Sequence, residues 1–203
     1  EYNIIKPAFT KLAKSSKLLM CAGNHGYDFS TYTTSSRTAI LNSISKNDIE
    51  DDLLDVVTSG QKSYYDFEKE LTFSLPTESS KLSKSYSYDE FELQALNTAW
   101  CSEIKEVGGQ LIFPERCLIK PSDSKTNILF FHHPLSWLEP NNQKAIRNYS
   151  RENFDIIITG HEHIADSFKV TSENNTSLMI ESISFDDPEV PDNGFISFII
   201  EDD

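Results

Sequence analysis

Short apolar runs along the chain predict strands, and a glycine or a histidine follows each of the three clearest ones. Residues 17–22 (KLLMCA), 127–131 (NILFF) and 155–159 (DIIIT) are too short for helices and are typical of buried strands. Three further strands are predicted near the C-terminus, at 167–170, 178–184 and 195–200.

Helical patterns lie before and between these runs. Helices are predicted at 4–14, at 34–45, from an N-cap at Asn47 through Val57, at 141–151 and, weakly, at 115–119. Pro7 fits the first of these only within the first turn of the helix. The strand, helix and strand between residues 127 and 159 indicate an α/β sheet, and the closing strands indicate an antiparallel edge or a second sheet.

Residues 58–90 have the least regular pattern. The Ser-, Lys- and Tyr-rich stretch at 79–88 (SSKLSKSYSY) is expected to form an exposed loop or part of a cap. Residues 91–100 are compatible with a strand or a short helix, and the pair Gly108-Gly109 marks a turn. We therefore expect residues 1–203 to form part of one domain, with a cap or loop insertion at about 46–90.

Composition limits the partners of the chain. With 203 residues, 38% of them hydrophobic, the chain can form one core. The 18 Lys and Arg residues against 32 Asp and Glu residues give a net charge of −14, which favours solubility. Because proteins bind duplex nucleic acid largely by neutralising phosphates, nucleic-acid binding would need a missing region or a partner to supply basic surface.

Cysteine usage and hydropathy indicate a cytoplasmic protein. The three cysteines, Cys21, Cys101 and Cys117, are odd in number and lack a CxxC spacing, so we expect no disulfide framework. No apolar stretch approaches the roughly 18 residues of a membrane span, and the first nine residues do not resemble a signal peptide. We therefore expect a cytoplasmic location and no membrane partner.

All five histidines directly follow predicted strands. His25 lies in GNHG, His132 and His133 lie in HHP, and His161 and His163 lie in GHEH. Sites in open α/β sheets form outside the carboxyl ends of the strands, so the pattern predicts one shared site, although a lone histidine is more often structural. Imidazole nitrogens and amide oxygens suit divalent metals, and two such metals can activate water and polarise a phosphoryl group.

The ordered set of GNH, an apolar strand with HHP and an apolar strand with GHxH resembles the calcineurin-like metallophosphoesterase family. The resemblance covers roughly residues 17–200, and the segment LNTAW at 96–100 adds to it. It implies an α/β sandwich of mixed β-sheets flanked by helices. It also implies two divalent metal ions, which could be Mn, Fe, Zn or Ni, and a phosphate-ester substrate.

The resemblance assigns metal ligands by position. Asn24 would bind one metal through its side-chain oxygen, and His132 and His161 would bind that same metal. His163 would bind the other metal. Glu162, which lies between the two histidines of GHEH, is expected to point away from the metals.

Three further side chains are expected near the substrate. His25 would contact the phosphate and assist the leaving group, as a general acid or by stabilising charge. His133 would shape the pocket or contact the substrate. Trp137 would line the substrate pocket, or it would only pack in the core.

The sequence departs from the family pattern at two places. Gly26 stands where the family usually has an acid after GNH, and Asp28 is the nearest substitute. The family's N-terminal DxH and GDxxD motifs are absent, because residues 1–24 contain no Asp and no His. The sheet is then expected to lack its first strands. The chain could be part of a longer protein, another chain could supply the missing half, or the domain could be a remnant without activity.

The sequence leaves two classes of function. The first is metal-dependent hydrolysis of a phosphate mono- or diester, and the second is a non-catalytic binding or assembly module on the same fold. No GxSxG or Walker motif is present, and nothing places a cysteine beside a histidine as a nucleophile pair.

Overall fold

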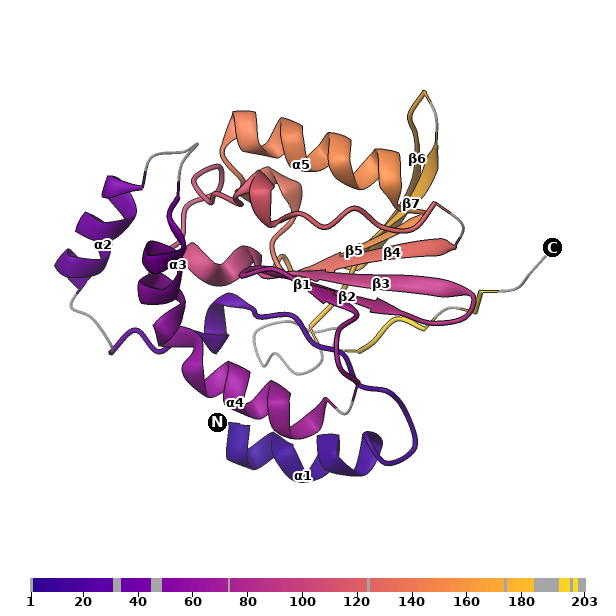
Figure 1. Ribbon diagram of the computed structural model, residues 1–203, viewed down its shortest axis with the longest axis horizontal. Helices are drawn as coiled ribbons and strands as arrows, with labels where there is room; N and C mark the ends of the chain where they lie inside the picture. Colours follow the sequence, from indigo (N-terminus) through magenta and orange to yellow (C-terminus); the bar gives the residue numbers. More distant parts are fainter. Residues whose placement is uncertain are drawn as a thin grey trace.

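The computed structural model describes residues 2–30, 34–44, 49–72, 74–123, 125–173, 175–184, 194–197 and 199–200. Seven strands in these residues form one mixed sheet in the order β1-β2-β3-β4-β5-β7-β6 (Figure 1). The strands are β1 (Glu78–Ser79), β2 (Ser83–Ser87), β3 (Phe91–Leu96), β4 (Thr126–Phe131), β5 (Ile156–Thr159), β6 (Asp166–Thr171) and β7 (Thr176–Glu181). The four central strands β3, β4, β5 and β7 are parallel, and β1, β2 and β6 are antiparallel to their neighbours.

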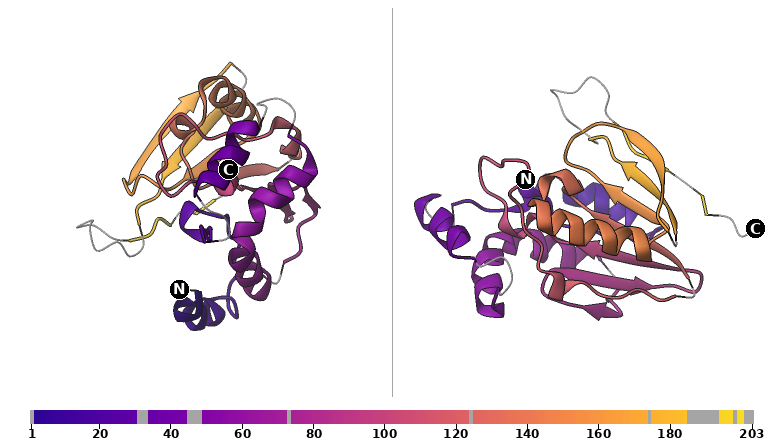
Figure 2. Two further views of the ribbon diagram at one scale, coloured as in Figure 1. Left: turned by 90° about the vertical axis from the view of Figure 1, so that its left-hand side faces the viewer. Right: turned by 90° about the horizontal axis from the view of Figure 1, so that it is seen from above.

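Helices flank this sheet. The α-helices are α1 (Tyr2–Leu12), α2 (Thr34–Ser43), α3 (Asp51–Thr58), α4 (Lys62–Leu71) and α5 (Pro140–Asn153). Single 3-10 turns are η1 (Asn24–Gly26), η2 (Ser59–Gln61), η3 (Thr98–Cys101), η4 (Glu115–Cys117) and η5 (Leu135–Trp137). In all three views, α5 lies on one side of the sheet, and α4 and α1 lie together on the opposite side of the molecule (Figures 1 and 2).

Side chains of the central strands alternate between two apolar clusters. Leu129 of β4 and Ile157 of β5 face the larger cluster, which also contains Ile146 of α5. Ile128 and Ile156, their neighbours along the strands, belong to a smaller cluster on the other face. This alternation follows from the two-residue period of a strand, and it fixes which face of the sheet α5 covers.

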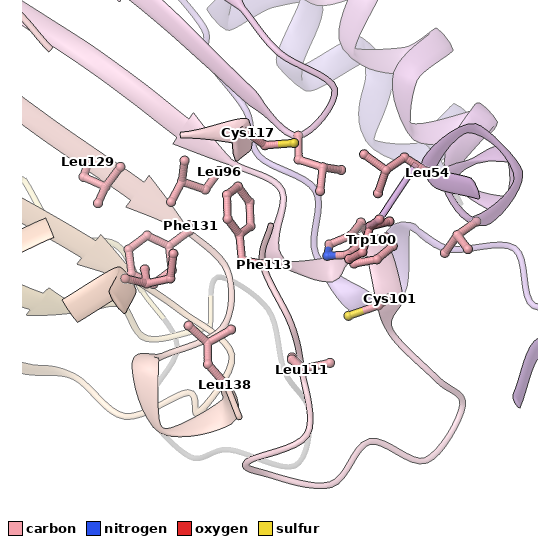
Figure 3. Packing of buried hydrophobic residues seen from close by; sticks show 14 of the residues in the cluster. Leu54, Leu96, Trp100, Cys101, Leu111, Phe113, Cys117, Leu129, Phe131 and Leu138 are labelled. Carbon is pink, nitrogen blue, oxygen red and sulfur yellow. The ribbon is translucent and has the colours of Figure 1, made fainter. Parts of the chain in front are cut away.

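The large cluster extends beyond the sheet to η3. Trp100 is completely buried, and its Nε1 donates a hydrogen bond of 2.6 Å to the carbonyl of Ile112. Figure 3 shows Trp100 beside Leu54 of α3, with Phe113 between Trp100 and the sheet. The segment that follows β3 is therefore anchored in the core, and it passes close to the ends of the central strands.

Helix α5 connects β4 to β5, as the strand–helix–strand pattern predicts. Pro140 occupies its first turn, where a missing N–H costs nothing, and the Glu139 side chain accepts from the Asn142 N–H. Ile146 and Ser150 are the buried residues of its inner face. The helix thereby holds β4 and β5 side by side in parallel.

The predicted strand at 17–22 is wrong. These residues are irregular, and only Ala22 among them is buried. A strand needs a hydrogen-bonded neighbour, but β3 is already paired with β2 and β4, and β1 occupies the other edge of β2. The segment instead lies against α4 and β2, where Met20 and Cys21 line a small cavity together with Tyr64.

The expected exposed loop at 79–88 is wrong at 83–87, which form β2. Ser83 and Ser85 are buried, and the Ser85 hydroxyl donates to a carboxylate oxygen of Glu92 at 2.6 Å. At Ser85 a polar partner thus replaces the apolar contact that usually marks a strand. The interpretation of 46–90 as an insertion stays a prediction.

The predicted strand at 195–200 is also wrong in its described part. Residues 194–197 and 199–200 are irregular, and Phe195 and Ile199 are 78% and 84% exposed. The central strand β7 is already paired with β5 and β6 on its two sides, so it offers no place for a further strand.

Several helix boundaries differ from the prediction. Pro7 is the sixth residue of α1 rather than part of its first turn. Asn47 lies outside the described residues, and the helix expected after it begins at Asp51 with Glu50 as its N-cap. The weak helix at 115–119 is only the single turn η4.

The α/β class with a mixed sheet flanked by helices is confirmed. The described strands form a single sheet. None of the described helices combines the length and the apolarity that crossing a membrane requires.

Candidate metal centre

The site lies at the carboxyl ends of the parallel neighbours β4 and β5. His132 directly follows β4, and Gly160 and His161 directly follow β5. The Gly160 N–H donates to the His132 carbonyl at 3.0 Å, which joins the two chain turns. The HHP and GHEH motifs, which lie far apart along the chain, thereby meet at one edge of the sheet.

Three histidines converge at this edge. One ring nitrogen from each of His132, His133 and His161 lies within 4.8 Å of the other two. His161 Nδ1 is 3.1 Å from His132 Nε2, and Asn24 Oδ1 is 3.0 Å from the same His132 nitrogen. The His161 nitrogen and the Asn24 oxygen therefore both lie close to His132 Nε2.

The backbone of GHEH takes an uncommon conformation at both histidines. His161 and His163 have φ angles of 75° and 55°, the left-handed region that residues other than Gly adopt only uncommonly. Such residues cluster at functional sites, where the surrounding structure holds them in place. Here Trp137 contributes, because its ring packs edge-on against His161 at 4.2 Å and its Nε1 donates to Glu162.

The GNHG segment reaches the site although no strand precedes it. The Gly26 N–H donates to the Gly23 carbonyl at 3.0 Å, closing the turn η1. Gly23 lies so close to His132 that a Cβ at this position would be 3.1 Å from the imidazole ring. The absence of a side chain at Gly23 lets Asn24 approach the histidines.

The pattern along the chain did not indicate Glu106, which is part of this site. Its side chain is only 5% exposed, and its Oε2 accepts from Asn24 Nδ2 at 2.7 Å. The two Glu106 oxygens also lie 3.3 and 3.4 Å from His133 Nε2. Glu106 lies in irregular chain between η3 and the turn at Gly108-Gly109, outside any motif, so only the tertiary structure could reveal it.

His133 is enclosed on all sides. Its side chain has no exposed surface, and its Nδ1 lies 3.1 Å from the Thr98 hydroxyl. Both ring nitrogens therefore have polar neighbours, Thr98 on one side and Glu106 on the other. The expected role of His133, shaping the pocket or contacting the substrate, stays a prediction.

Burial and neighbouring charges keep His132 and His161 neutral. Desolvation, followed by the charges of His133 and His161, lowers the pKa of His132 from 6.5 to about 3. Desolvation and the charge of His133 also lower the pKa of His161. Burial alone would raise the pKa of Glu106, but hydrogen bonds from His133 and other neighbours lower it to about 2. Near pH 7, neutral imidazoles thus present lone pairs beside an ionised carboxylate.

His25 lies at the border of the site. The His25 N–H donates to Asn24 Oδ1 at 3.1 Å, and the side chain is exposed. The imidazole lines a groove of about 510 Å³ together with Lys6 of α1 and Asp66 of α4. Asp28 lines the same groove, and its Oδ1 accepts from the backbone and hydroxyl of Ser30, at 2.9 and 2.6 Å.

His163 and Trp137 differ in how closely they join the cluster. His163 is half-buried and is not one of the three histidines that converge. Its assignment to a second metal stays a prediction. Trp137 is half-buried and contacts His161, and its Nε1 donates a hydrogen bond to Glu162.

The converging atoms fit a divalent cation. Ligands about 2.0–2.1 Å from a tetrahedral zinc ion lie about 3.3 Å from one another. The separations of 3.0 and 3.1 Å at His132 Nε2 are close to that spacing. Because metal ligands must be deprotonated, the neutral state of His132 and His161 also suits metal binding.

Comparison with known proteins agrees with the motifs. A family model for calcineurin-like phosphoesterases matches residues 1–165. No curated protein and no solved structure matches the chain. The family match spans most of the sequence and includes the GNH, HHP and GHEH segments. The chain belongs to the calcineurin-like phosphoesterase family.

Proposed function

We propose that the protein hydrolyses a phosphate mono- or diester with the help of divalent metal ions. The observation that carries this proposal is the meeting of Asn24 Oδ1, His132 Nε2 and His161 Nδ1 at the ends of β4 and β5. Family membership supports the reaction class, because calcineurin-like phosphoesterases act on phosphate esters.

Asn24, His132 and His161 would hold the first metal, and His163 would contribute to a second. A bound divalent metal supplies Lewis-acid polarisation of the phosphoryl group and a nucleophile at neutral pH. Imidazole-rich ligand sets accept Mn, Fe, Zn and Ni, so the choice of metal is open within this group. We propose that carboxylate ligands for the second metal come from another segment or from another chain.

The residues of the chain position the substrate around this centre. His25 is exposed beside the groove, and its backbone is fixed by Asn24. Its imidazole can donate a hydrogen bond or a proton to the departing oxygen of the ester. The Trp137 ring packs edge-on against His161 and forms one wall of the site beside it.

Because the protein is negatively charged, an anionic substrate needs bound metal ions at the site. The chain carries a net charge of −14, which repels an anionic phosphate ester at long range. Bound cations are the largest local charges in such a site and reverse its sign locally. Nucleic-acid substrates would still need basic surface from a partner or a further region.

A non-catalytic module on the same fold is the second candidate, and one observation favours it. Within the described residues, no carboxylate is hydrogen-bonded to the His25 ring, since Gly26 replaces the usual acid and Asp28 is bound to Ser30. An unoriented imidazole is a poorer general acid. Such a module would retain the fold and bind a partner without turnover.

Hydrolysis of p-nitrophenyl phosphate and bis-p-nitrophenyl phosphate distinguishes the two candidates. With the segment or chain that supplies the carboxylate ligands present, we expect turnover with Mn²⁺ or another of the four metals, and a loss of at least about 10-fold in His161→Ala. Ser136→Ala is the matched control, because Ser136 is exposed next to the HHP motif and should leave the rate unchanged. Metal binding without turnover of either ester would support the non-catalytic module.

A further inference from the structure

Glu106 contacts the amide nitrogen of Asn24, whereas His132 lies beside the amide oxygen. Its Oε2 accepts a hydrogen bond of 2.7 Å from Asn24 Nδ2, while Asn24 Oδ1 is 3.0 Å from His132 Nε2. We propose that Glu106 is a positioning residue that holds the Asn24 amide with its oxygen toward the metal. This inference rests on the proposed metal centre and adds a residue that no motif of the sequence indicates.

The two ends of the Asn24 amide differ in their hydrogen bonding. The Asn side chain donates through its nitrogen and accepts through its oxygen, whereas an ionised carboxylate only accepts. Glu106 can therefore bond only to the nitrogen end of Asn24, which turns the oxygen end toward His132 and His161. The reversed amide would place oxygen against oxygen at Glu106 and offer the metal a nitrogen that has no available lone pair.

Glu106 can impose this orientation because its own position is fixed from the core. His133 Nε2 lies 3.3 and 3.4 Å from the two carboxylate oxygens, and His133 Nδ1 lies 3.1 Å from the Thr98 hydroxyl. The Thr98 hydroxyl also accepts from the His133 N–H at 3.1 Å. Thr98 and His133 have no exposed surface, so a continuous polar chain runs from the core to Asn24.

The hydrogen bonds from Thr98 through His133 to Glu106 compensate for the irregular backbone around Glu106. No helix or strand holds residues 102–110, and Ile104 and Val107 in this segment are 60% and 55% exposed. Backbone hydrogen bonds anchor Ser102 and Gly109 at the two ends of this segment, and side-chain contacts orient the carboxylate between them. Polar partners that orient metal ligands in this way typically contribute about 10–100-fold to metal affinity.

Titration of the metal-free 203-residue chain with Zn²⁺ or Co²⁺ at about pH 7.5 tests the inference. We expect Glu106→Gln to weaken binding of the first metal by about 10–100-fold. The matched control is Glu103→Gln, the same change three residues earlier, where the carboxylate accepts from the Thr38 hydroxyl at 2.9 Å. The control should bind the metal within about twofold of the unchanged chain, and thermal unfolding of each variant reports whether it is folded.

A double-mutant cycle with Asn24→Asp separates orientation from a general effect of charge. The carboxylate that Asn24→Asp introduces has no nitrogen end, so Glu106 would oppose it rather than orient it. The amide that Glu106→Gln introduces could instead donate its own N–H to that carboxylate. We therefore expect Glu106→Gln to cost about tenfold or more in affinity when residue 24 is Asn, and less than about twofold when residue 24 is Asp.

The outcomes separate this inference from the proposed function. If the unchanged chain binds neither metal, both the metal centre and the role of Glu106 are overturned. If the unchanged chain binds the metal and folded Glu106→Gln binds it equally well, only the role of Glu106 is overturned. An equal loss of metal affinity in Glu103→Gln also overturns the role of Glu106. The same holds if Glu106→Gln lowers the metal affinity equally whether residue 24 is Asn or Asp.

Discussion

Gly23 lies against the imidazole ring of His132, close enough that a Cβ at Gly23 would stand 3.1 Å from Cε1 and Nδ1 of the ring. Gly23→Ala should therefore push His132 away by a few tenths of an ångström. A displacement of about 1 Å in an active site can lower the rate about 100-fold. Because the displacement of His132 is smaller than this, we expect metal affinity to fall between about twofold and tenfold. Isothermal titration with Zn²⁺ measures this change.

Gly160→Ala is the matched control for that experiment. A Cβ at Gly160 would lie 3.8 Å from His132 Nδ1, an ordinary contact that requires no movement. Affinity in Gly160→Ala should equal that of the unchanged chain. Equal losses in the two alanine variants would contradict the importance of close approach at Gly23.

The lowered pKa of His132 predicts that acid destabilises the metal-free protein. Between pH 6.5 and about 3, the unfolded chain binds a proton that folded His132 excludes, so the free energy of unfolding falls as the pH drops. The slope from this residue is at most about 1.4 kcal/mol per pH unit. Urea unfolding in the presence of a chelator, at several pH values from neutral down to about 5, measures it.

His132→Asn removes the titrating group from that measurement. The free energy of unfolding should then depend less on pH just below 6.5, while His161 still contributes a slope of the same sign. Glu106 titrates lower, between pH 4.5 and about 2, and does not affect this range. An unchanged pH dependence in His132→Asn would argue against a neutral, buried imidazole.

Trp137 is expected to support His161 mainly through its ring. The edge-on contact at 4.2 Å is of a kind worth about 0.5–1.5 kcal/mol, whereas the bond from Nε1 to Glu162 lies at the exposed edge. Trp137→Phe should keep most of the metal affinity, and Trp137→Ala should lose about two- to tenfold. The same titration measures both, and an equal loss in the two variants would show that the bond to Glu162 matters more.

Gly60 is expected to be important for folding rather than for the site. A Cβ at Gly60 would stand 2.3 Å from the ring of Tyr27, which is buried under Arg37 and donates to the Val57 carbonyl at 2.7 Å. Because the ring cannot move freely, Gly60→Ala should reduce the free energy of unfolding by about 1–3 kcal/mol.

Gly108→Ala is the comparison for Gly60→Ala, because a Cβ at Gly108 would meet nothing within 4 Å. Urea unfolding of the two variants under one set of conditions gives the difference. A stability loss in Gly108→Ala as large as in Gly60→Ala would mean that steric conflict with Tyr27 is not the cause.

The parts of the fold that the sequence predicts are those with local apolar signals. β4 and β5 each contain an unbroken apolar run, ILFF in β4 and III in β5, and are largely buried, so their composition marks them. Histidines that follow such strands in a parallel sheet must meet at one edge, which is why His132 and His161 could be placed together before the structure was known.

The parts that the sequence does not predict depend on distant partners. Residues 17–22 have the composition of a strand, but β2 and β3, near which they lie, already have a strand on each side. β2 has the composition of a loop, yet it pairs with β3, and the carboxylate of Glu92 accepts from the Ser85 hydroxyl. Glu106 joins the site through contacts with Asn24 and His133, which are 82 and 27 residues away, and no local pattern carries that information.

The central claim is that Asn24, His132 and His161 bind a divalent metal. The most direct measurement is the metal content of the folded chain after reconstitution with Zn²⁺ or Mn²⁺ and gel filtration, by mass spectrometry of the elements, in the unchanged chain and in His132→Ala and His161→Ala. We predict at least one bound metal per unchanged chain and a loss of that metal in both variants. A folded chain that carries no metal, or two variants that retain it, would contradict the account.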